Sequence, residues 1–349
     1  MARETFRKII TTDENLLAIN PKNKELINKF LRSFDTKSAK TSVVNYQSDY
    51  NIFFCWNVVY NDNKFFVDIK KSDLIDFFSF AVSDLQWGSA RYRRMHSALS
   101  SLSKYIENIL DDEYPDFKSL MPKVDKIPNT IVREKTVLSE TQINNLLEHL
   151  KQTNKQWACL FALAISSGAR ISELFRFTTD LIDEENTGFD GIFLKTKKPI
   201  RTKGRGRSGT RMYKYIIKDI FLPTYQEWMI ERKKILKQNN LSDHRYLFIT
   251  REGMPATAAT ARRWIAHWEK YLSNEEPSNK NKEKVSLYPH SLRHYLVSHL
   301  TRLGLSSDLI VSIMGWQSSD MYKIYNDVSD DEREWKDLDK LKEYLEQKE

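Results

Sequence analysis

Cysteine is scarce in this chain. Cys55 and Cys159 are the only two among 349 residues, and each lies between apolar or aromatic neighbours. Buried reduced thiols commonly have such surroundings, and two isolated cysteines do not provide a disulfide framework. The sequence therefore predicts a protein of a reducing, intracellular compartment.

Long apolar runs are also missing. The residues after Met1 include no apolar core of signal-peptide length, and no later run approaches the about 18 apolar residues of a membrane span. Residues 1–40 carry no cluster of metal ligands, and no internal repeat or low-complexity tract is evident. We therefore expect a cytoplasmic protein that does not enter a membrane.

Acidic residues are the minority among the charged ones. The chain has 47 Asp and Glu against 55 Lys and Arg, which gives a formal net charge of +8 at pH 7. This excess favours an anionic partner such as nucleic acid, although a merely basic soluble protein is the alternative. The length allows two domains, each with its own core.

The pattern of the chain changes at a stretch with three prolines between residues 115 and 128. Upstream, apolar residues such as Leu99 and Ile106 recur at helical spacing. Downstream, Ser139 and Gln142 form a capping-box signature for a new helix. We expect an N-terminal extension, a helical domain, a linker, a second domain and an amphipathic tail, with the bounds 1–40, 41–120, 121–136, 137–327 and 328–349.

Three motifs carry the chemistry. Arg170 follows a glycine turn and opens an apolar helical run. His290 and Arg293 are three residues apart after a proline, so one helix face presents both. Tyr325 lies about the length of a short helix after Gly315-Trp316. Arginine, His-x-x-Arg and tyrosine in this order resemble the tyrosine recombinase (phage integrase) family of site-specific DNA recombinases.

The resemblance implies a multi-domain, mainly α protein. A helical N-terminal core-binding domain and a mixed α+β catalytic domain with a small antiparallel sheet would clamp double-stranded DNA at a specific recombination site. It also implies a homo-tetramer on DNA, with an accessory host or directionality factor as an optional partner, and integration or excision of a mobile element. A type IB topoisomerase-like relaxing enzyme and a non-catalytic DNA-binding relative are the alternatives.

Cutting a phosphodiester without a metal requires cations on its non-bridging oxygens. Arg170 and Arg293 suit this role because guanidinium is always charged and presents a planar fork. The resemblance gives His290 a proton-handling role, which its ordinary pKa of about 6.5 suits. Glu173 would orient Arg170, although the two alone are also a routine ion pair on a helix surface.

Tyr325 is the expected nucleophile, because a phosphotyrosyl bond stores the energy of the broken phosphodiester for rejoining. Tyr322 lies one helical turn earlier and competes for the role, but the distance from Trp316 to Tyr325 fits the family. Trp316 stands where many members have histidine. Its indole N–H can donate to a phosphate oxygen but cannot transfer a proton. The alternative is a core tryptophan without a polar contact.

In the family, the acid for the leaving group is a lysine on a hairpin. Residues 191–198 alternate like a strand, and residues 211–217 could return beside it. Lys195 and Lys197 both fit and would share one strand face. Lys203 in the loop is a weaker choice. The loop also matches G-x-G-x-x-G, but strand-like residues follow it where a helix should open, so we reject nucleotide binding.

Several basic clusters are candidates for DNA contacts or, equally, for solvated faces. They are Arg91, Arg93 and Arg94 beside a serine cap, Lys203, Arg205 and Arg207 in the hairpin loop, and Arg262 and Arg263 on a helix at about 256–272.

His290, His294 and His299 have spacing that a zinc site can use, but the glutamate of H-E-x-x-H is missing, so we expect neither a metal nor a cofactor. The acidic tail has an apolar face that the resemblance would dock onto a neighbouring subunit, made by Trp335, Leu338, Leu341 and Leu345.

Overall fold

The structure is a computed structural model that describes residues 10–35, 40–128, 138–202, 210–274, 287–316 and 318–328. The chain divides into two compact units, and the boundary in the sequence falls between residues 134 and 135. The described part of the first unit spans residues 10–128, and that of the second spans residues 138–328 with the gaps given above. No helix within these ranges is long and apolar enough to span a bilayer.

The first unit is helical. Its elements are α1 (Asp13–Ala18), α2 (Pro21–Asp35), α3 (Lys40–Tyr60), η2 (Phe66–Asp68), α4 (Lys71–Ser83), α5 (Ser89–Ile109) and η3 (Met121–Lys123). The core is rich in aromatic side chains and includes Leu26 and Phe30 of α2, as well as Met121 and Val124. The helical core therefore extends beyond the expected range 41–120 on both sides.

The start of α5 differs in one detail from the expectation. Gly88, not Ser89, is the N-cap residue of this helix. The expected serine cap is therefore wrong. A glycine is a favourable N-cap because its backbone reaches the required extended conformation without strain.

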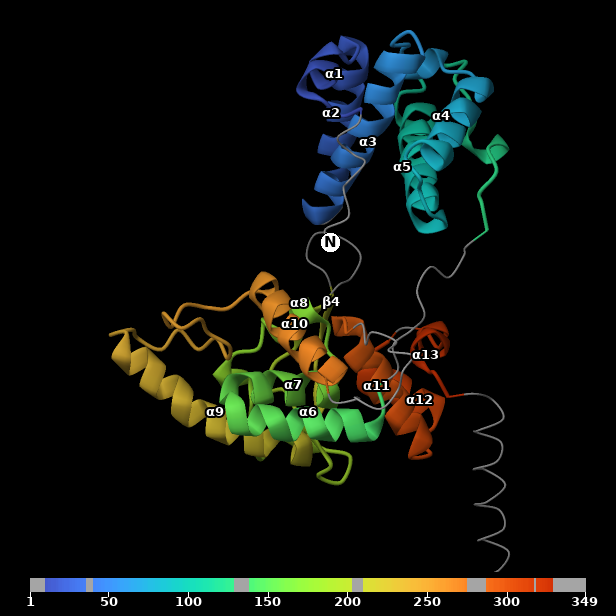
Figure 1. Cartoon of the computed structure of the whole chain (residues 1–349). Helices are drawn as coiled ribbons and strands as arrows, with labels where there is room; N and C mark the ends of the chain where they lie inside the picture. Colours follow the sequence, from blue (N-terminus) through green and yellow to red (C-terminus); the bar gives the residue numbers. More distant parts are fainter. Residues whose placement is uncertain are drawn as a thin grey trace, which may run out of the picture. The chain divides into compact units, whose positions relative to one another are not determined.

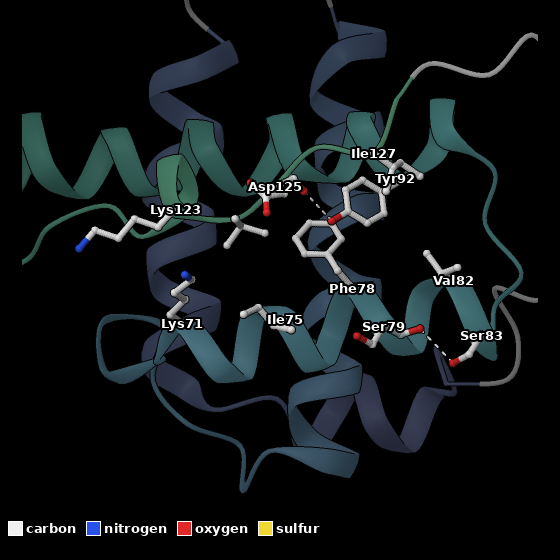
Figure 2. A pocket seen from close by; sticks show the side chains of 11 residues that line it. Lys71, Ile75, Phe78, Ser79, Val82, Ser83, Tyr92, Lys123, Asp125 and Ile127 are labelled. Carbon is white, nitrogen blue, oxygen red and sulfur yellow. Dashed lines mark hydrogen bonds between the residues drawn. The ribbon is translucent and has the colours of Figure 1, made fainter.

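A groove of about 460 Å³ lies in the first unit between α4 and the segment that follows η3. Figure 2 shows Phe78 and Tyr92 at its centre, with Ile75 and Val82 along α4. The Tyr92 hydroxyl donates a hydrogen bond of 2.8 Å to the carbonyl oxygen of Asp125, which fixes this segment onto α5. None of the candidate catalytic residues lines this groove.

The second unit is built around a buried helix. Its elements before the sheet are α6 (Glu140–Thr153), α7 (Lys155–Ser167), α8 (Ile171–Leu174) and η4 (Thr179–Leu181), and after it come α9 (Lys218–Gln238), α10 (Ala258–Asn274), α11 (Pro289–Arg302), α12 (Ser307–Met314) and α13 (Asp320–Tyr325). Every residue of α7 from 158 to 167 is buried. α6, α9 and α11 all pack against it, and α6, α7 and α9 lie alongside one another in Figure 1.

The predicted capping box at the start of α6 is confirmed. The Ser139 hydroxyl accepts from the Gln142 backbone N–H at 3.1 Å, and the Gln142 side chain accepts from the Ser139 N–H at 2.9 Å. Two N–H groups without partners inside the helix are thus satisfied.

The strands are short and antiparallel. β1 (Thr187–Gly188), β2 (Phe193–Lys195) and β5 (Tyr215–Ile217) form one sheet in the order β1-β2-β5, while β3 (Ile200–Thr202) pairs with β4 (Thr210–Met212). Leu194 lies opposite Ile216, and both are buried. The predicted return beside the first strand is therefore confirmed for residues 215–217, whereas residues 211 and 212 pair with β3 instead. The mainly helical fold with small antiparallel sheets is confirmed.

Candidate active site

Arg170 is fixed by the turn that ends α7. Gly168 has φ +55°, a left-handed backbone conformation that favours glycine because other residues adopt it only with strain. Arg170 then caps α8: its backbone N–H donates to Oε2 of Glu173 at 3.1 Å, and its Nη1 donates to Oε1 at 3.0 Å. The glutamate thus orients Arg170 through both its backbone and its side chain.

Arg293 comes from α11 and is only 2% exposed. Its Nη1 donates to the Gly168 carbonyl oxygen at 2.6 Å, which ties the arginine to the turn that carries Arg170. Its Nε and Nη2 are buried and have no hydrogen-bond acceptor among the described residues. Burial, with the nearby charge of Arg170, lowers the pKa of Arg293 to about 10, so the group stays charged at neutral pH.

Such unpaired donors are unusual, because most buried N–H groups in folded proteins have a partner. A buried cation with two unused donor nitrogens has the chemistry that suits an anion. A phosphate oxygen is the matching acceptor.

A lysine that the sequence reasoning did not single out joins this cluster. Lys214 lies between β4 and β5, is 2% exposed, and places its Nζ 2.9 Å from Oε2 of Glu173. Burial lowers the pKa of Lys214, Glu173 opposes the shift, and the charges of Arg293 and Arg170 add to it. A lysine in a run of apolar and aromatic residues was the only sequence signal for it.

The fully buried Glu173 is a carboxylate among cations. Burial on its own would raise the pKa of Glu173, but the charge and hydrogen bond of Lys214, together with Arg170, lower it below the ordinary value. The group therefore carries its negative charge at neutral pH.

Tyr325 ends α13 and is 6% exposed. Its hydroxyl lies 3.1 Å from Nδ1 of His290, and the Arg293 guanidinium lies 5.1 Å from the centre of its ring. α11, α12 and α13 pack together, as Figure 1 shows, and this packing brings the histidine, arginine and tyrosine to one place. Tyr322 belongs to the same small apolar cluster but has a different partner, because its hydroxyl lies 3.1 Å from Oγ1 of Thr301.

Trp316 completes the group around Arg293. Its ring stacks on that of Tyr325 with centroids 5.4 Å apart, and the Arg293 guanidinium lies 5.1 Å from the ring centre. The indole Nε1 is buried and has no acceptor within the described ranges. This N–H is a third unused donor beside Tyr325.

Comparison with known proteins decides the family. A model of the phage integrase family matches residues 136–332, more than half of the chain. The chain belongs to this family. A curated tyrosine recombinase from Thermosipho africanus is 23% identical over 270 residues, which cover 76% of this chain and 83% of that protein. The chain is therefore a tyrosine recombinase, an enzyme that cleaves and rejoins DNA.

Solved structures agree on the fold. The Tn1549 transposon integrase in complex with transposon right end DNA matches with a TM-score of 0.67 and 15% identity, over 91% of this chain and 98% of that one. A lambda integrase dimer bound to a core site matches with a TM-score of 0.61 and 13% identity, over 87% and 95%. At such identities the likeness concerns the fold alone.

In the recombinase, two of the lysines expected to protonate the leaving group lie beside a tyrosine ring and an aspartate. The Lys195 Nζ lies 4.6 Å from the centre of the Tyr213 ring, and the Lys197 Nζ lies 3.2 Å from Oδ2 of Asp183. β2 ends at Lys195, so the expectation that both lysines share a strand face is wrong. Lys203 lies outside the described residues.

The candidate DNA-contacting arginines fall into different settings. Arg91 and Arg94 bind the carboxylate of the buried Asp49, and Arg93 donates to the Ile127 carbonyl oxygen at 3.3 Å. In the recombinase's α10, positions 262 and 263 are exposed while the opposite face is buried in the core. Three further candidates lie outside the described residues, namely Lys203, Arg205 and Arg207.

The remaining histidines of α11 have structural neighbours. Nδ1 of His294 lies 3.0 Å from Oδ2 of Asp327, two residues beyond Tyr325, and His299 stacks on Tyr295. Among the described residues, no group of three or more His, Cys, Asp or Glu side chains has a metal-binding arrangement. The tail with Trp335, Leu338, Leu341 and Leu345 lies outside the described residues.

Proposed function

We propose that the recombinase cuts one DNA strand per active subunit through a 3′-phosphotyrosyl intermediate on Tyr325. The Tyr325 oxygen forms a bond to the scissile phosphorus, the bond from phosphorus to O5′ breaks, and O5′ takes up a proton. A 5′-hydroxyl of the partner duplex then loses its proton and attacks the phosphorus, the bond from phosphorus to the Tyr325 oxygen breaks, and the tyrosine takes up a proton as the strand is rejoined. The exchange conserves bond energy, so no nucleotide cofactor is required.

The observation that carries this proposal is the set of unused donors beside Tyr325. Nε and Nη2 of Arg293 are buried without an acceptor among the described residues, and its guanidinium lies 5.1 Å from the Tyr325 ring. Donors held in place at a buried site stabilise the charge that develops on the phosphate oxygens. Arg170, held by Glu173, supplies the second guanidinium.

His290 is the proton acceptor of the nucleophile in this scheme, because its Nδ1 lies 3.1 Å from the Tyr325 hydroxyl. The departing O5′ receives its proton from a lysine of the hairpin, for which Lys195, Lys197 and Lys203 remain the candidates. Trp316 is an anchor that donates its indole N–H to a phosphate oxygen.

The test is a denaturant-resistant protein–DNA adduct formed without metal on a duplex that the protein itself selects from a random-sequence pool. We expect Tyr325→Phe to abolish the adduct and Tyr322→Phe to retain it, since the Tyr322 hydroxyl faces Thr301. Loss with Tyr322→Phe alone would move the nucleophile to Tyr322. Specific binding without any adduct would favour a non-catalytic DNA-binding relative.

We further propose that the enzyme acts on paired sites as a homo-tetramer and integrates or excises a mobile element. The mobile-element part of this proposal is suggested by the role of one protein of the same fold, the Tn1549 transposon integrase. An accessory host or directionality factor is a further proposed partner. A plasmid without the selected site separates this from the topoisomerase-like alternative: relaxation of that plasmid would favour the relaxing enzyme, whereas exchange between two sites supports recombination.

A further inference from the structure

The buried Lys214 forms an ion pair at the heart of the proposed active site. Glu173 uses both carboxylate oxygens: Oε1 accepts from Arg170 Nη1, while Oε2 accepts from the Arg170 backbone N–H and lies 2.9 Å from the Lys214 Nζ. The side chains of Glu173 and Lys214 are 0% and 3% exposed. Water therefore does little to screen the charges in this pair.

The backbone holds Lys214 in this place. Its N–H donates to Oγ1 of Thr196 at 3.1 Å, and its carbonyl oxygen accepts from the Thr196 N–H at 3.0 Å. Thr196 is fully buried and directly follows β2. The sheet therefore fixes the lysine opposite Glu173.

Lys214 offsets the negative charge that Glu173 brings into the cluster. Glu173 orients Arg170 but also cancels one of the two positive charges of Arg170 and Arg293. When a tyrosine oxygen attacks a phosphodiester after losing its proton, the phosphoryl group and the nucleophile together carry two negative charges. With Lys214 in place, the two arginines, Glu173 and Lys214 keep two net positive charges, to which the proton that His290 takes from the tyrosine adds a third, and in a buried site such preorganised charge has a large effect on rate.

We propose that Lys214 is a positioning residue that neutralises Glu173, so that Glu173 can hold Arg170 in place without reducing the charge offered to the phosphate. The inference rests on the proposed phosphotyrosyl chemistry, but not on the identity of the leaving-group acid. Burial and the neighbouring arginines lower the pKa of Lys214, whereas its ion pair with Glu173 opposes this shift and favours the charged form.

The experiment compares single-turnover adduct formation by Lys214→Met, Glu173→Gln and the double variant. We expect Lys214→Met to slow cleavage by roughly tenfold to a hundredfold, since Glu173 then cancels a charge without compensation. In the double variant the neutral amide still accepts from Arg170, so we expect it to be faster than Lys214→Met alone. Lys233→Met, an exposed change on α9, is the matched control and should keep the wild-type rate.

A second substrate, with sulfur in place of the bridging O5′, distinguishes positioning from acid catalysis. A thiolate leaves without a proton, so this substrate restores cleavage to a variant that lacks only its general acid. We expect no restoration for Lys214→Met. Restoration by sulfur, or a double variant as slow as the single one, would overturn the proposal, as would an unchanged rate in Lys214→Met.

Folding and the proposed function are checked separately. If Lys214→Met does not fold, the double variant, which carries no unpaired buried charge, and Lys214→Arg decide the question. A wild-type adduct that persists in Tyr325→Phe would instead refute the proposed function. The Lys214 comparison uses only a wild-type adduct that depends on Tyr325.

Discussion

The two units use buried carboxylates to hold arginines in different ways. In the first unit, Arg91 and Arg94 both bind the 3% exposed Asp49, and their own side chains remain 20% and 39% exposed. In the second unit, Glu173 holds Arg170 while the buried Arg293 keeps two N–H groups without an acceptor among the described residues. A guanidinium that pairs with a buried carboxylate of its own chain stabilises the fold, whereas Arg293, with Nε and Nη2 both buried and unused by the described residues, is available to a ligand.

We expect the largest effect from a change of Arg293, the arginine with unused donors. Arg293→Lys keeps the charge but loses the planar fork, and we expect adduct formation to slow by about a hundredfold or more. Single-turnover assays at saturating DNA measure the change. Arg251→Lys, an exposed position, is the control and should leave the rate unchanged. Near wild-type cleavage by Arg293→Lys would show that the two unused donors have no role in it.

Removing Asp49 tests the other half of the comparison. We expect Asp49→Ala to lower the free energy of unfolding by about 2 kcal/mol, less than the about 3–5 kcal/mol of a fully buried pair because the arginines are partly exposed. Urea unfolding of the whole chain measures it. The exposed pair of Glu148 and Lys151 is the control, where Glu148→Ala should change stability by less than about 0.5 kcal/mol.

A measurement of DNA binding by an Arg94 variant tests whether this arginine of α5 serves the fold or the DNA. Arg94→Ala should reduce stability, because it removes a partner of the buried Asp49. A large loss of DNA affinity by Arg94→Ala with unchanged stability would instead assign this arginine to the DNA, as the sequence prediction allows.

A change of Trp316 should have a smaller effect on the cleavage rate, and Trp268 provides a matched control. The indole N–H groups of Trp316 and Trp268 are both buried and lack acceptors in the described part of the chain, but Trp268 packs in the core away from Tyr325. We expect Trp316→Phe to slow cleavage by about tenfold, the value of one hydrogen bond to a charged group. Trp268→Phe should affect stability without changing the rate at saturating DNA. Equal rates for both variants would make Trp316 a packing residue only.

Local signals account for what the sequence predicted well. The capping box at Ser139, the helix opened by Pro289 and the glycine turn before Arg170 each depend on a few neighbouring residues. His290 and Arg293 could be placed on one face because helical spacing fixes it. The mainly helical fold followed from the same periodicity.

Long-range partners account for what it could not predict. Lys214 becomes important only through Glu173, far upstream, and Arg94 depends on Asp49 in α3. The alternation that pointed to Lys197 continues past the end of β2, where Asp183 binds this lysine instead. Spacing along the chain indicates which residues can share an element, but it does not indicate which side chain of another element neutralises them.

The smallest expected effect concerns pH. Burial alone would raise the pKa of Glu173, but Lys214 and Arg170 lower it below the ordinary 4.5, so the folded chain holds the proton less tightly than the unfolded chain. The ion pairs of Glu173 therefore stabilise the fold fully above pH 4.5, and this contribution is lost as the pH falls through the lower pKa of the folded state. The difference in unfolding free energy between wild type and Glu173→Gln should change only below that pH, as measured by urea unfolding. A constant difference from pH 7 to about pH 3 would mean that the cations do not hold Glu173 as an anion, and the contrast between the two units would then rest on Arg293 alone.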